Sequence, residues 1–256
     1  MPLITVITIN YNNANGLQKT IDSVVDQSFK DFEFIVIDGQ SSDGSVDIIK
    51  KSNKINYWCS EKDHGIYDAQ SKGILKATGD YLLFLNSGDV LSDNSVLVKV
   101  SSYLKGGKSF YYGNLILEKQ GVLEKHLAPK IIDIDFMLNS TFWHPCVFIK
   151  STLFRNYGLY DTSFKIAGDY EFFIRCLLKP AVTTEHMEEF ITVFDGNGIS
   201  NDSSQDGLQL EEREKAWKLN ISEIVYESLK KQNSFSRSKY AFVINSLQKL
   251  RGKQKF

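Results

Sequence analysis

The segment from Ser60 to Gly73 and the apolar run behind it constrain the fold of this chain more than any other feature. The segment is polar and contains two glycines, and from Ile66 onward its apolar residues have helical spacing. The run Tyr81 to Leu85 is typical of a buried strand, and it ends in the polar turn Asn86-Ser87-Gly88-Asp89. Such a helix and such a strand end are suited to binding a phosphorylated ligand. These features indicate an enzyme that handles nucleotides.

Apolar strands alternate with helical segments through the first half of the chain. Strands that are apolar throughout are buried on both faces, so we expect a parallel sheet that is covered by helices on both sides. Ligands of such sheets bind at the carboxyl ends of the strands. The expected strands are Leu3 to Ile9, Phe32 to Ile37, Asn56 to Ser60 and Tyr81 to Leu85.

The pattern changes after residue 105, where segments typical of strands follow one another without full helical crossovers. A helix is expected from about Tyr170 to Leu178, and the composition beyond Gly207 is helical. We therefore expect an α/β fold with a mixed, mainly parallel central sheet, flanking helices and a helical C-terminal extension. The expected strands of this half are Phe110 to Gly113, Leu115 to Glu118, Phe142 to Lys150 and Ile191 to Phe194.

Composition and cysteine usage indicate a soluble protein in a reducing compartment. The 256 residues are 42% hydrophobic, which is enough to bury the core of one large domain. A net charge of −1 gives no overall attraction to nucleic acid or to a membrane. Cys59, Cys146 and Cys176 lack metal-type spacing, and neither a secretory signal nor a run of about 18 apolar residues is present. We expect a cytoplasmic protein that binds no nucleic acid.

Four motifs then occur in an order that points to a known family. No P-loop or Gly-x-Gly-x-x-Gly run follows a predicted strand, which argues against two other nucleotide-binding folds. The four motifs are Thr5 to Asn12, Val36 to Ser45, Gly65 to Ala69 and Leu85 to Asp89. With these motifs the chain resembles, over roughly residues 3 to 200, the family 2 glycosyltransferases of the GT-A fold. The resemblance implies inverting transfer of a sugar from a nucleotide diphosphate, UDP by default, to a hydroxyl of a glycan or lipid-linked acceptor in cell-surface polysaccharide synthesis.

The resemblance also divides the chain. It implies a GT-A domain over residues 1–205, with a nucleotide-sugar-binding half (1–104) and an acceptor-binding half (105–205), followed by a helical, basic extension over residues 206–256. All charged residues from Lys230 onward are basic, and apolar residues between Tyr240 and Leu250 have helical spacing. This segment fits peripheral contact with the inner face of the plasma membrane, docking on its own domain, or a homodimer interface.

The ends of the first two strands carry expected donor contacts. Ile9, Asn10 and Tyr11 end the first strand, where Tyr11 offers a flat face for a base, although a plain strand exit is the alternative. The resemblance implies that Asp38, beside Gly39, hydrogen-bonds the base or the ribose. A turn-forming role for Asp38 is the alternative.

Asp68 and Lys72 are four residues apart, so they share one helix face and a plain ion pair is the simplest interpretation. The resemblance implies that Asp68 faces the donor. Lys72 is then expected to neutralise phosphate charge.

The turn of Asn86, Ser87, Gly88 and Asp89 departs from the family pattern. Family members commonly carry Asp-x-Asp here, whereas Asn86 and Gly88 occupy two of the usual acidic positions and Asp89 keeps its carboxylate. We expect Asp89 to bind Mg²⁺ or Mn²⁺ together with the donor phosphates, more weakly than a full acidic pair. The first three residues are expected donor contacts. An ordinary type I turn is the alternative.

The acceptor half must supply a base. The resemblance places an acidic pair before a helix, and here Gly168 replaces the first acid while Asp169 keeps the second. We expect Asp169 to deprotonate the acceptor hydroxyl, with Glu171 as second choice and helix capping as the alternative role for Asp169.

Trp143 and His144 precede the expected strand of the second half and are candidate substrate contacts. Packing is the alternative for Trp143, and a satisfied structural histidine is the alternative for His144. The run Asp195 to Ser200 resembles a glycine-rich loop over the donor phosphates, and a plain turn would have the same sequence.

Two other functions stay open at the level of sequence. The depleted acidic turn fits a sugar-nucleotide-binding protein without catalysis. A nucleotidyltransferase has less support, because no glycine-rich, basic loop follows the first strand.

Overall fold

The computed structural model describes residues 1–196 and 203–234 of the chain. Its first half alternates strands and helices as expected, and all three strand pairings within it are parallel. The elements are β1 (Ile4–Asn10), α1 (Ala14–Val25), β2 (Phe32–Asp38), α2 (Ser45–Lys51), β3 (Tyr57–Ser60), α3 (Ile66–Lys76) and β4 (Tyr81–Phe84).

The second half adds strands that run mostly against their neighbours. Its elements are β5 (Val90–Leu91), α4 (Val96–Leu104), β6 (Phe110–Lys119), β7 (Val122–His126), α5 (Ile134–Asn139), a 3₁₀ turn (His144–Cys146), β8 (Val147–Lys150), α6 (Thr152–Tyr157), α7 (Gly168–Leu177), β9 (Thr184–Asp195), a second 3₁₀ turn (Ser203–Gln205) and α8 (Asp206–Asn220). Helical residues 223–234 follow α8.

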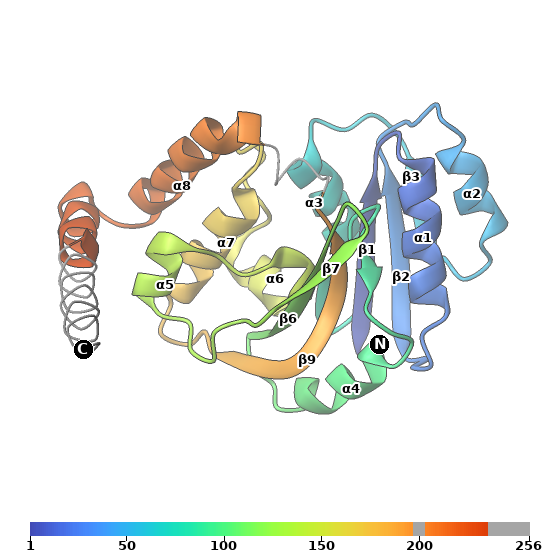
Figure 1. Ribbon diagram of the computed structural model, residues 1–256, viewed down its shortest axis with the longest axis horizontal. Helices are drawn as coiled ribbons and strands as arrows, with labels where there is room; N and C mark the ends of the chain where they lie inside the picture. The colour runs from blue at the N-terminus through green and yellow to red at the C-terminus, as the bar shows by residue number, and fades with distance from the viewer. Residues whose placement is uncertain (197–202, 235–256) are drawn as a thin grey trace, which may run out of the picture.

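One mixed sheet unites both halves (Figure 1). Within the described residues it has nine strands in the order β3-β2-β1-β4-β8-β6-β9-β5, with β7 paired to β6. Strand β8 is antiparallel to both β4 and β6, and β9 is parallel to β6. The expected α/β class with a mixed, helix-flanked sheet is confirmed.

The sheet separates two apolar cores. Successive residues of a strand point to opposite faces, so Val6 packs in the core beneath α1 and α4 while Ile7 packs in the core beneath α3 and α7. Both side chains are fully buried. Coverage on both faces explains the apolar character of the central strands.

Three expected strand limits were wrong. The runs Phe110 to Gly113 and Leu115 to Glu118 form the single strand β6, which continues along β9 through a register shift near Asn114. The expected strand Phe142 to Lys150 begins only at Val147, because Pro145 has no N–H to donate to a ladder and lies in a 3₁₀ turn. Strand β9 is longer than expected, since it begins at Thr184.

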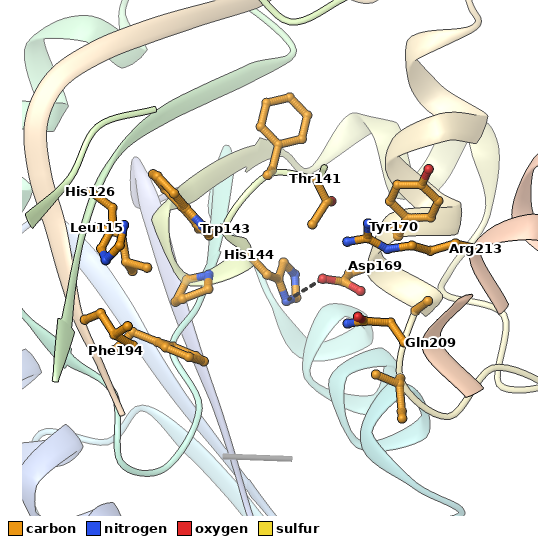
Figure 2. Close-up of a pocket in the computed structure, with 15 residues that line it drawn as sticks. Leu115, His126, Thr141, Trp143, His144, Asp169, Tyr170, Phe194, Gln209 and Arg213 are labelled. Atoms are coloured by element: carbon orange, nitrogen blue, oxygen red, sulfur yellow. Dashed lines mark ion pairs between the residues drawn. The ribbon is translucent and has the colours of Figure 1, made fainter. Parts of the chain in front are cut away.

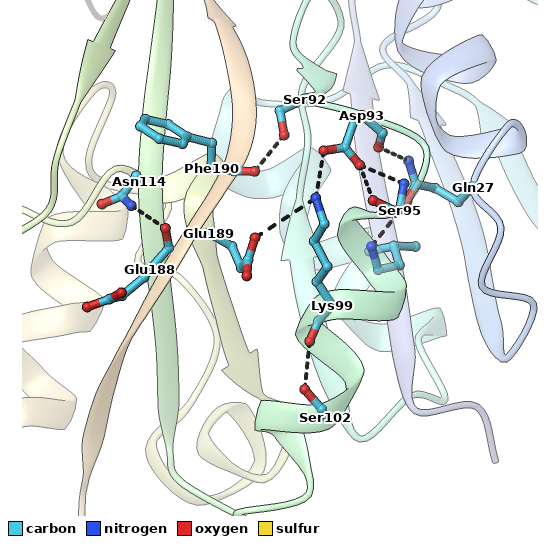
Figure 3. A network of polar contacts seen from close by, with 11 residues as sticks. Gln27, Ser92, Asp93, Ser95, Lys99, Ser102, Asn114, Glu188, Glu189 and Phe190 are labelled. Carbon is cyan, nitrogen blue, oxygen red and sulfur yellow. Dashed lines mark hydrogen bonds and ion pairs between the residues drawn. The ribbon is translucent and has the colours of Figure 1, made fainter.

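A polar network joins the start of α4 to β9 and to the end of α1 (Figure 3). Lys99 Nζ lies 2.9 Å from Asp93 Oδ2 and 4.0 Å from Glu189 Oε2. Gln27, which is buried, donates to the carbonyl of Asp93 at 2.7 Å and accepts from the Leu97 amide. The halves are therefore anchored to each other by side chains as well as by the sheet.

The helix α8 packs against α7. Trp217 Nε1 donates to the Tyr170 hydroxyl at 2.8 Å, and Asn220 Nδ2 donates to Glu171 at 3.1 Å. The first part of the predicted extension therefore contributes to the acceptor half. The predicted amphipathic segment Tyr240 to Leu250 lies outside the described residues. In the described ranges, no helix is both long and apolar enough to span a bilayer.

Candidate active site

Asn10 connects the carboxyl ends of three neighbouring strands. Its Nδ2 donates to Asp38 Oδ1 at 2.8 Å, and its Oδ1 accepts from the Ser87 hydroxyl at 2.6 Å. The Ser87 amide and hydroxyl also donate to the carbonyl of Ile9, at 3.1 and 3.2 Å. The structure thus brings together expected donor residues from three of the sequence motifs.

The Asp38 carboxylate is fully buried and accepts several hydrogen bonds. Besides Asn10, it accepts from the amide and hydroxyl of Ser41 and from the hydroxyl of Ser60, at 2.6 to 2.9 Å. Burial alone would raise the pKa of Asp38, but these hydrogen bonds outweigh it and the pKa is lowered. In this arrangement Asp38 stabilises the strand ends, and its contact with a base or ribose stays a prediction.

Tyr11 and Gly39 form an open rim beside these strand ends. The Tyr11 side chain is 70% exposed. A Cβ added to Gly39 would lie 2.5 Å from Asp63 Oδ2 and 3.2 Å from Tyr11 Cδ2, so a side chain at position 39 would have to displace the Asp63 carboxylate. An exposed ring, a bare backbone and a carboxylate side by side are suited to binding a nucleobase.

Asp68 and Lys72 form the ion pair that their spacing predicts, at 3.6 Å. Lys72 also lies 3.0 Å from Glu61 and donates to the carbonyl of Lys62. Asp68 accepts from the His64 amide at 3.0 Å. Both side chains are therefore engaged within the protein, and their donor contacts stay predictions.

The turn after β4 places Asp89 beneath the surface. Asp89 is 4% exposed, and its Oδ1 accepts from the Asp195 amide at 3.1 Å. Burial raises the pKa of Asp89 to about 7 despite this hydrogen bond. Asn86 Oδ1 accepts a long hydrogen bond, 3.4 Å, from Gln70.

A second carboxylate reaches this turn from β9. A Cβ on Gly88 would lie 3.2 Å from Asp195 Oδ2, so the Asp195 carboxylate lies beside Gly88, a position where the family resemblance implies an acid. Across residues 1–196 and 203–234, no group of three or more His, Cys, Asp or Glu side chains is arranged to hold a metal ion. Two carboxylates do fit Mg²⁺ or Mn²⁺ when substrate phosphates complete the coordination shell. Asp89 and Asp195 are the residues that would hold the ion.

A cavity of about 270 Å³ opens among residues of the second half of the chain and of α8 (Figure 2). Its walls are largely aromatic and apolar. Its charged groups lie at the start of α7 and on α8, and other polar groups come from β7 and from the segment before β8. Asp169, the expected base, lines it together with His144 and Trp143, two expected substrate contacts. The remaining lining residues are Leu115, Leu117, His126, Thr141, Phe142, Pro145, Ile166, Ala167, Tyr170, Phe194, Gln209 and Arg213.

Asp169 lies in the first turn of α7 with one oxygen engaged. Its Oδ1 accepts from the Tyr67 hydroxyl at 3.0 Å. In the part of the chain that the structure describes, Oδ2 makes no hydrogen bond, and His144 Nδ1 lies 4.0 Å from it. A carboxylate that is held by one oxygen and open at the other has the geometry of a general base.

His144 stands beside Asp169 as a neutral group. Its ring stacks on Phe84 with centroids 4.8 Å apart, and its Nε2 lies 2.9 Å from the Tyr160 hydroxyl. Burial lowers the pKa of His144, and the charge of Asp169 opposes this only in part. Trp143 meets His126 edge to face at the opposite wall.

Glu171, the second choice for the base, is not brought into the cavity. It is 4% exposed and lies 2.8 Å from Arg175 Nη2, and it also accepts from Asn220. Residues two apart on a helix point in nearly opposite directions, so Asp169 and Glu171 cannot face the same space. Glu171 stabilises the packing of α7 instead.

Sequence reasoning missed three residues that shape this site. Tyr67 lies inside the third motif and contacts Asp169. Glu212 on α8 accepts from the amides of Lys165, Ile166 and Ala167 at 2.7 to 2.9 Å and so holds the loop before α7. Arg213 lines the cavity. Of the three residues, only Tyr67 had a signal in the sequence, because it lies within the motif Gly65 to Ala69. No role was expected for its side chain.

The fold is that of a GT-A glycosyltransferase. A half with parallel strands and polar strand ends is joined to a half whose cavity holds a carboxylate. The model of the family described as "Glycosyl transferase family 2" matches residues 5–173, and the chain belongs to this family.

Known proteins agree with this assignment. A Mycobacterium tuberculosis protein named as an uncharacterized glycosyltransferase is 36% identical over 183 residues, which cover 69% of this chain and 70% of the relative. Staphylococcus aureus TarS 1-349, solved with UDP-GlcNAc, superimposes with a TM-score of 0.63 at 18% identity and covers 78% of this chain. The mannosyltransferase PcManGT of Pyrobaculum calidifontis, solved with GDP-Man and Mn²⁺, gives 0.57 at 15% identity over 75% of this chain. This chain spans 60% and 56% of those two structures, which support the fold.

Proposed function

We propose that the protein transfers a sugar from a nucleotide diphosphate sugar to a hydroxyl group of a glycan or lipid-linked acceptor, with inversion at the anomeric carbon. UDP is the nucleotide of first choice, and cell-surface polysaccharide synthesis is the proposed process. The observation that carries the proposal is the position of Asp169, whose Oδ2 is open toward a cavity in the acceptor half.

In the proposed reaction Asp169 Oδ2 accepts the proton of the acceptor hydroxyl. The acceptor oxygen attacks the anomeric carbon from the face opposite the nucleotide, and the bond from that carbon to the diphosphate oxygen breaks. Tyr67 keeps Oδ1 occupied, so the carboxylate presents Oδ2 in a fixed direction. Burial lowers the pKa of His144 and so weakens it as a proton acceptor, which favours Asp169 as the base.

The nucleotide is proposed to bind at the ends of β1, β2 and β4. Tyr11 would stack on the base, with the backbone at Gly39 and the Asp63 carboxylate beside it. Asp89 and Asp195 would hold Mg²⁺ or Mn²⁺. Such an ion, when bound, stabilises the negative charge that develops on the departing diphosphate.

A thermal-shift screen of nucleotide sugars, with and without Mn²⁺, tests donor binding first, since a ligand that binds only the folded state raises the melting temperature. Transfer of radiolabelled sugar then tests catalysis. The variant Asp169→Asn should reduce turnover by a factor of about 10² to 10⁴ and leave nucleotide affinity close to the wild-type value. Unchanged turnover would remove Asp169 from the mechanism.

The same two assays distinguish a glycosyltransferase from a sugar-nucleotide-binding protein without catalysis. Binding of a nucleotide sugar without transfer to any acceptor and without hydrolysis would favour a non-catalytic binding protein. We further propose a cytoplasmic site of action, with contact to the membrane or to a second copy through the C-terminal residues beyond Ser234.

A further inference from the structure

We propose that Arg213 binds an anionic group, a carboxylate or a phosphate, on the acceptor sugar, so that this protein selects a negatively charged acceptor. The inference deepens the proposed function and rests on it. It starts from the cavity in Figure 2, where Arg213 and Asp169 are the two lining side chains with a full charge.

Arg213 is held in place without a carboxylate partner. Its guanidinium lies over the Tyr170 ring, 4.8 Å from the centroid, and the residue is half-buried. Among the residues that the structure describes, no Asp or Glu forms an ion pair with it. Figure 2 shows Arg213 directed toward the same space as Asp169, although the two do not pair.

The neighbouring Arg175 shows what a purely structural arginine looks like in this region. It contacts Glu171 at 2.8 Å and donates to the carbonyls of Tyr157 and Leu159. A partly desolvated guanidinium is stable when its donors are satisfied in this way. Among residues 1–196 and 203–234 Arg213 has no such partner, and its planar donor set matches a carboxylate or a phosphate.

The position of the cavity indicates that the anionic group belongs to the acceptor and not to the donor. All of its lining residues lie at position 115 or beyond, in the acceptor half and in α8. The polar strand ends at Asn10, Asp38 and Ser87 belong to the other half. The volume of about 270 Å³ is near the lower end of small-molecule sites, roughly 300–1,000 Å³, and suits one sugar unit.

Two matched pairs of probes test the inference by isothermal titration calorimetry in the presence of UDP and Mn²⁺. One pair is p-nitrophenyl β-D-glucuronide and p-nitrophenyl β-D-glucoside, which differ by a carboxylate. The other pair is α-D-glucose 1-phosphate and methyl α-D-glucoside, which differ by a phosphate. In at least one pair the anionic member should bind about ten-fold tighter or more, because a hydrogen bond to a charged group contributes about that much to affinity. The pair that shows the preference identifies the kind of anion.

Variants then test whether the preference for the anionic probe depends on Arg213. Arg213→Met should abolish it, and Arg213→Lys should keep part of it, because lysine retains the charge without the fork of donors. Arg155→Met is the matched control, since Arg155 is exposed on α6 and does not line the cavity. Melting temperatures of all variants show that they are folded.

Three results would overturn the inference. One is the lack of any preference for an anionic probe in the wild-type protein, including the lack of measurable binding. Another is a preference that survives in Arg213→Met. The third is a loss of UDP affinity in Arg213→Met as large as the loss for the anionic probe, which would assign Arg213 to the donor diphosphate. A wild-type protein that binds no nucleotide would instead contradict the proposed function.

Discussion

The hydroxyl of Tyr67 donates to Asp169 Oδ1 at 3.0 Å and so joins two residues that are 102 positions apart. Tyr67 lies on α3, in the half that is proposed to bind the nucleotide, whereas Asp169 lies on α7 beside the acceptor cavity. The same hydroxyl also lies 2.5 Å from the carbonyl of Ile166, in the loop before α7. One phenol therefore connects the two halves at the proposed general base.

Tyr67→Phe should lower the rate of sugar transfer by about ten-fold, because Asp169 loses the hydrogen bond that fixes its orientation. The free energy of unfolding should fall by about 1 to 2 kcal/mol. The measurement is kcat together with urea unfolding.

The matched control for Tyr67→Phe is Tyr81→Phe. Tyr81 is also a buried tyrosine, and it donates to the carbonyl of Lys108 away from the cavity. The Tyr81→Phe variant should lose about as much stability as Tyr67→Phe, and its kcat in the folded protein should be normal. Equal kcat for both variants would contradict the positioning role of Tyr67.

Gly168→Ala should impair both stability and transfer. A Cβ at position 168 would lie 2.7 Å from Cδ2 of the Tyr67 ring, whose hydroxyl is held by its two hydrogen bonds. Overpacking of this kind costs about 1 to 3 kcal/mol.

Gly207→Ala on α8 is the control for Gly168→Ala, because no neighbouring segment among the described residues has an atom within 4 Å of its added Cβ. Alanine is the better helix former, so this variant should be neutral or slightly stabilised. Thermal unfolding and a transfer assay measure both variants. Normal activity in Gly168→Ala would show that the ring can move without affecting the site.

Glu212→Ala should destabilise the protein by about 3 kcal/mol, because three backbone amides before α7 lose their acceptor. Transfer should fall in the folded fraction as well, since that loop sets the position of Asp169. Glu211→Ala alters the exposed neighbouring residue and should leave both quantities unchanged. Identical melting temperatures for the two variants would contradict this role.

His144→Gln should change how stability depends on pH. Burial lowers the pKa of His144 below its usual 6.5, so below pH 6.5 the unfolded chain takes up a proton that the native state does not. The free energy of unfolding of the wild-type protein should therefore fall as the pH drops from 7 to 5, and part of this decrease should disappear in the variant.

Urea unfolding at several pH values measures the effect of His144→Gln. The comparison variant is His64→Gln, because the His64 side chain is 86% exposed. Its stability should follow the wild-type pH dependence. A His144→Gln curve parallel to that of the wild type would show that His144 titrates freely in the native state.

Much of the fold could be predicted from local pattern. The apolar runs and helical periodicity placed the four strands of the first half within a residue or two, because a buried parallel strand must be apolar along its whole length. The limits in the second half were less accurate. Pro145 interrupts one expected strand, and the register shift near Asn114 joins two others.

The candidate site was predicted unevenly for a physical reason. Asp169 carries a charge next to a helix start, and such a signal can be seen in a short window of sequence. Arg213 and Glu212 lie in a helix whose sequence gives no sign of a cavity, and both act on residues more than 40 positions away. Glu171 shows the opposite error, because its local sequence matched while its helix face pointed away from the cavity.

The sequence by itself determined the family, the alternation of strands and helices, and the chemical types available for catalysis, since all of these depend on residue identity and short-range spacing. Only the tertiary structure decided which of those groups meet. Packing of α8 on α7 and of α3 against the loop before α7 brings Tyr67, Asp169 and Arg213 to one region. Contacts between distant segments depend on how whole elements pack, and local propensity does not encode them.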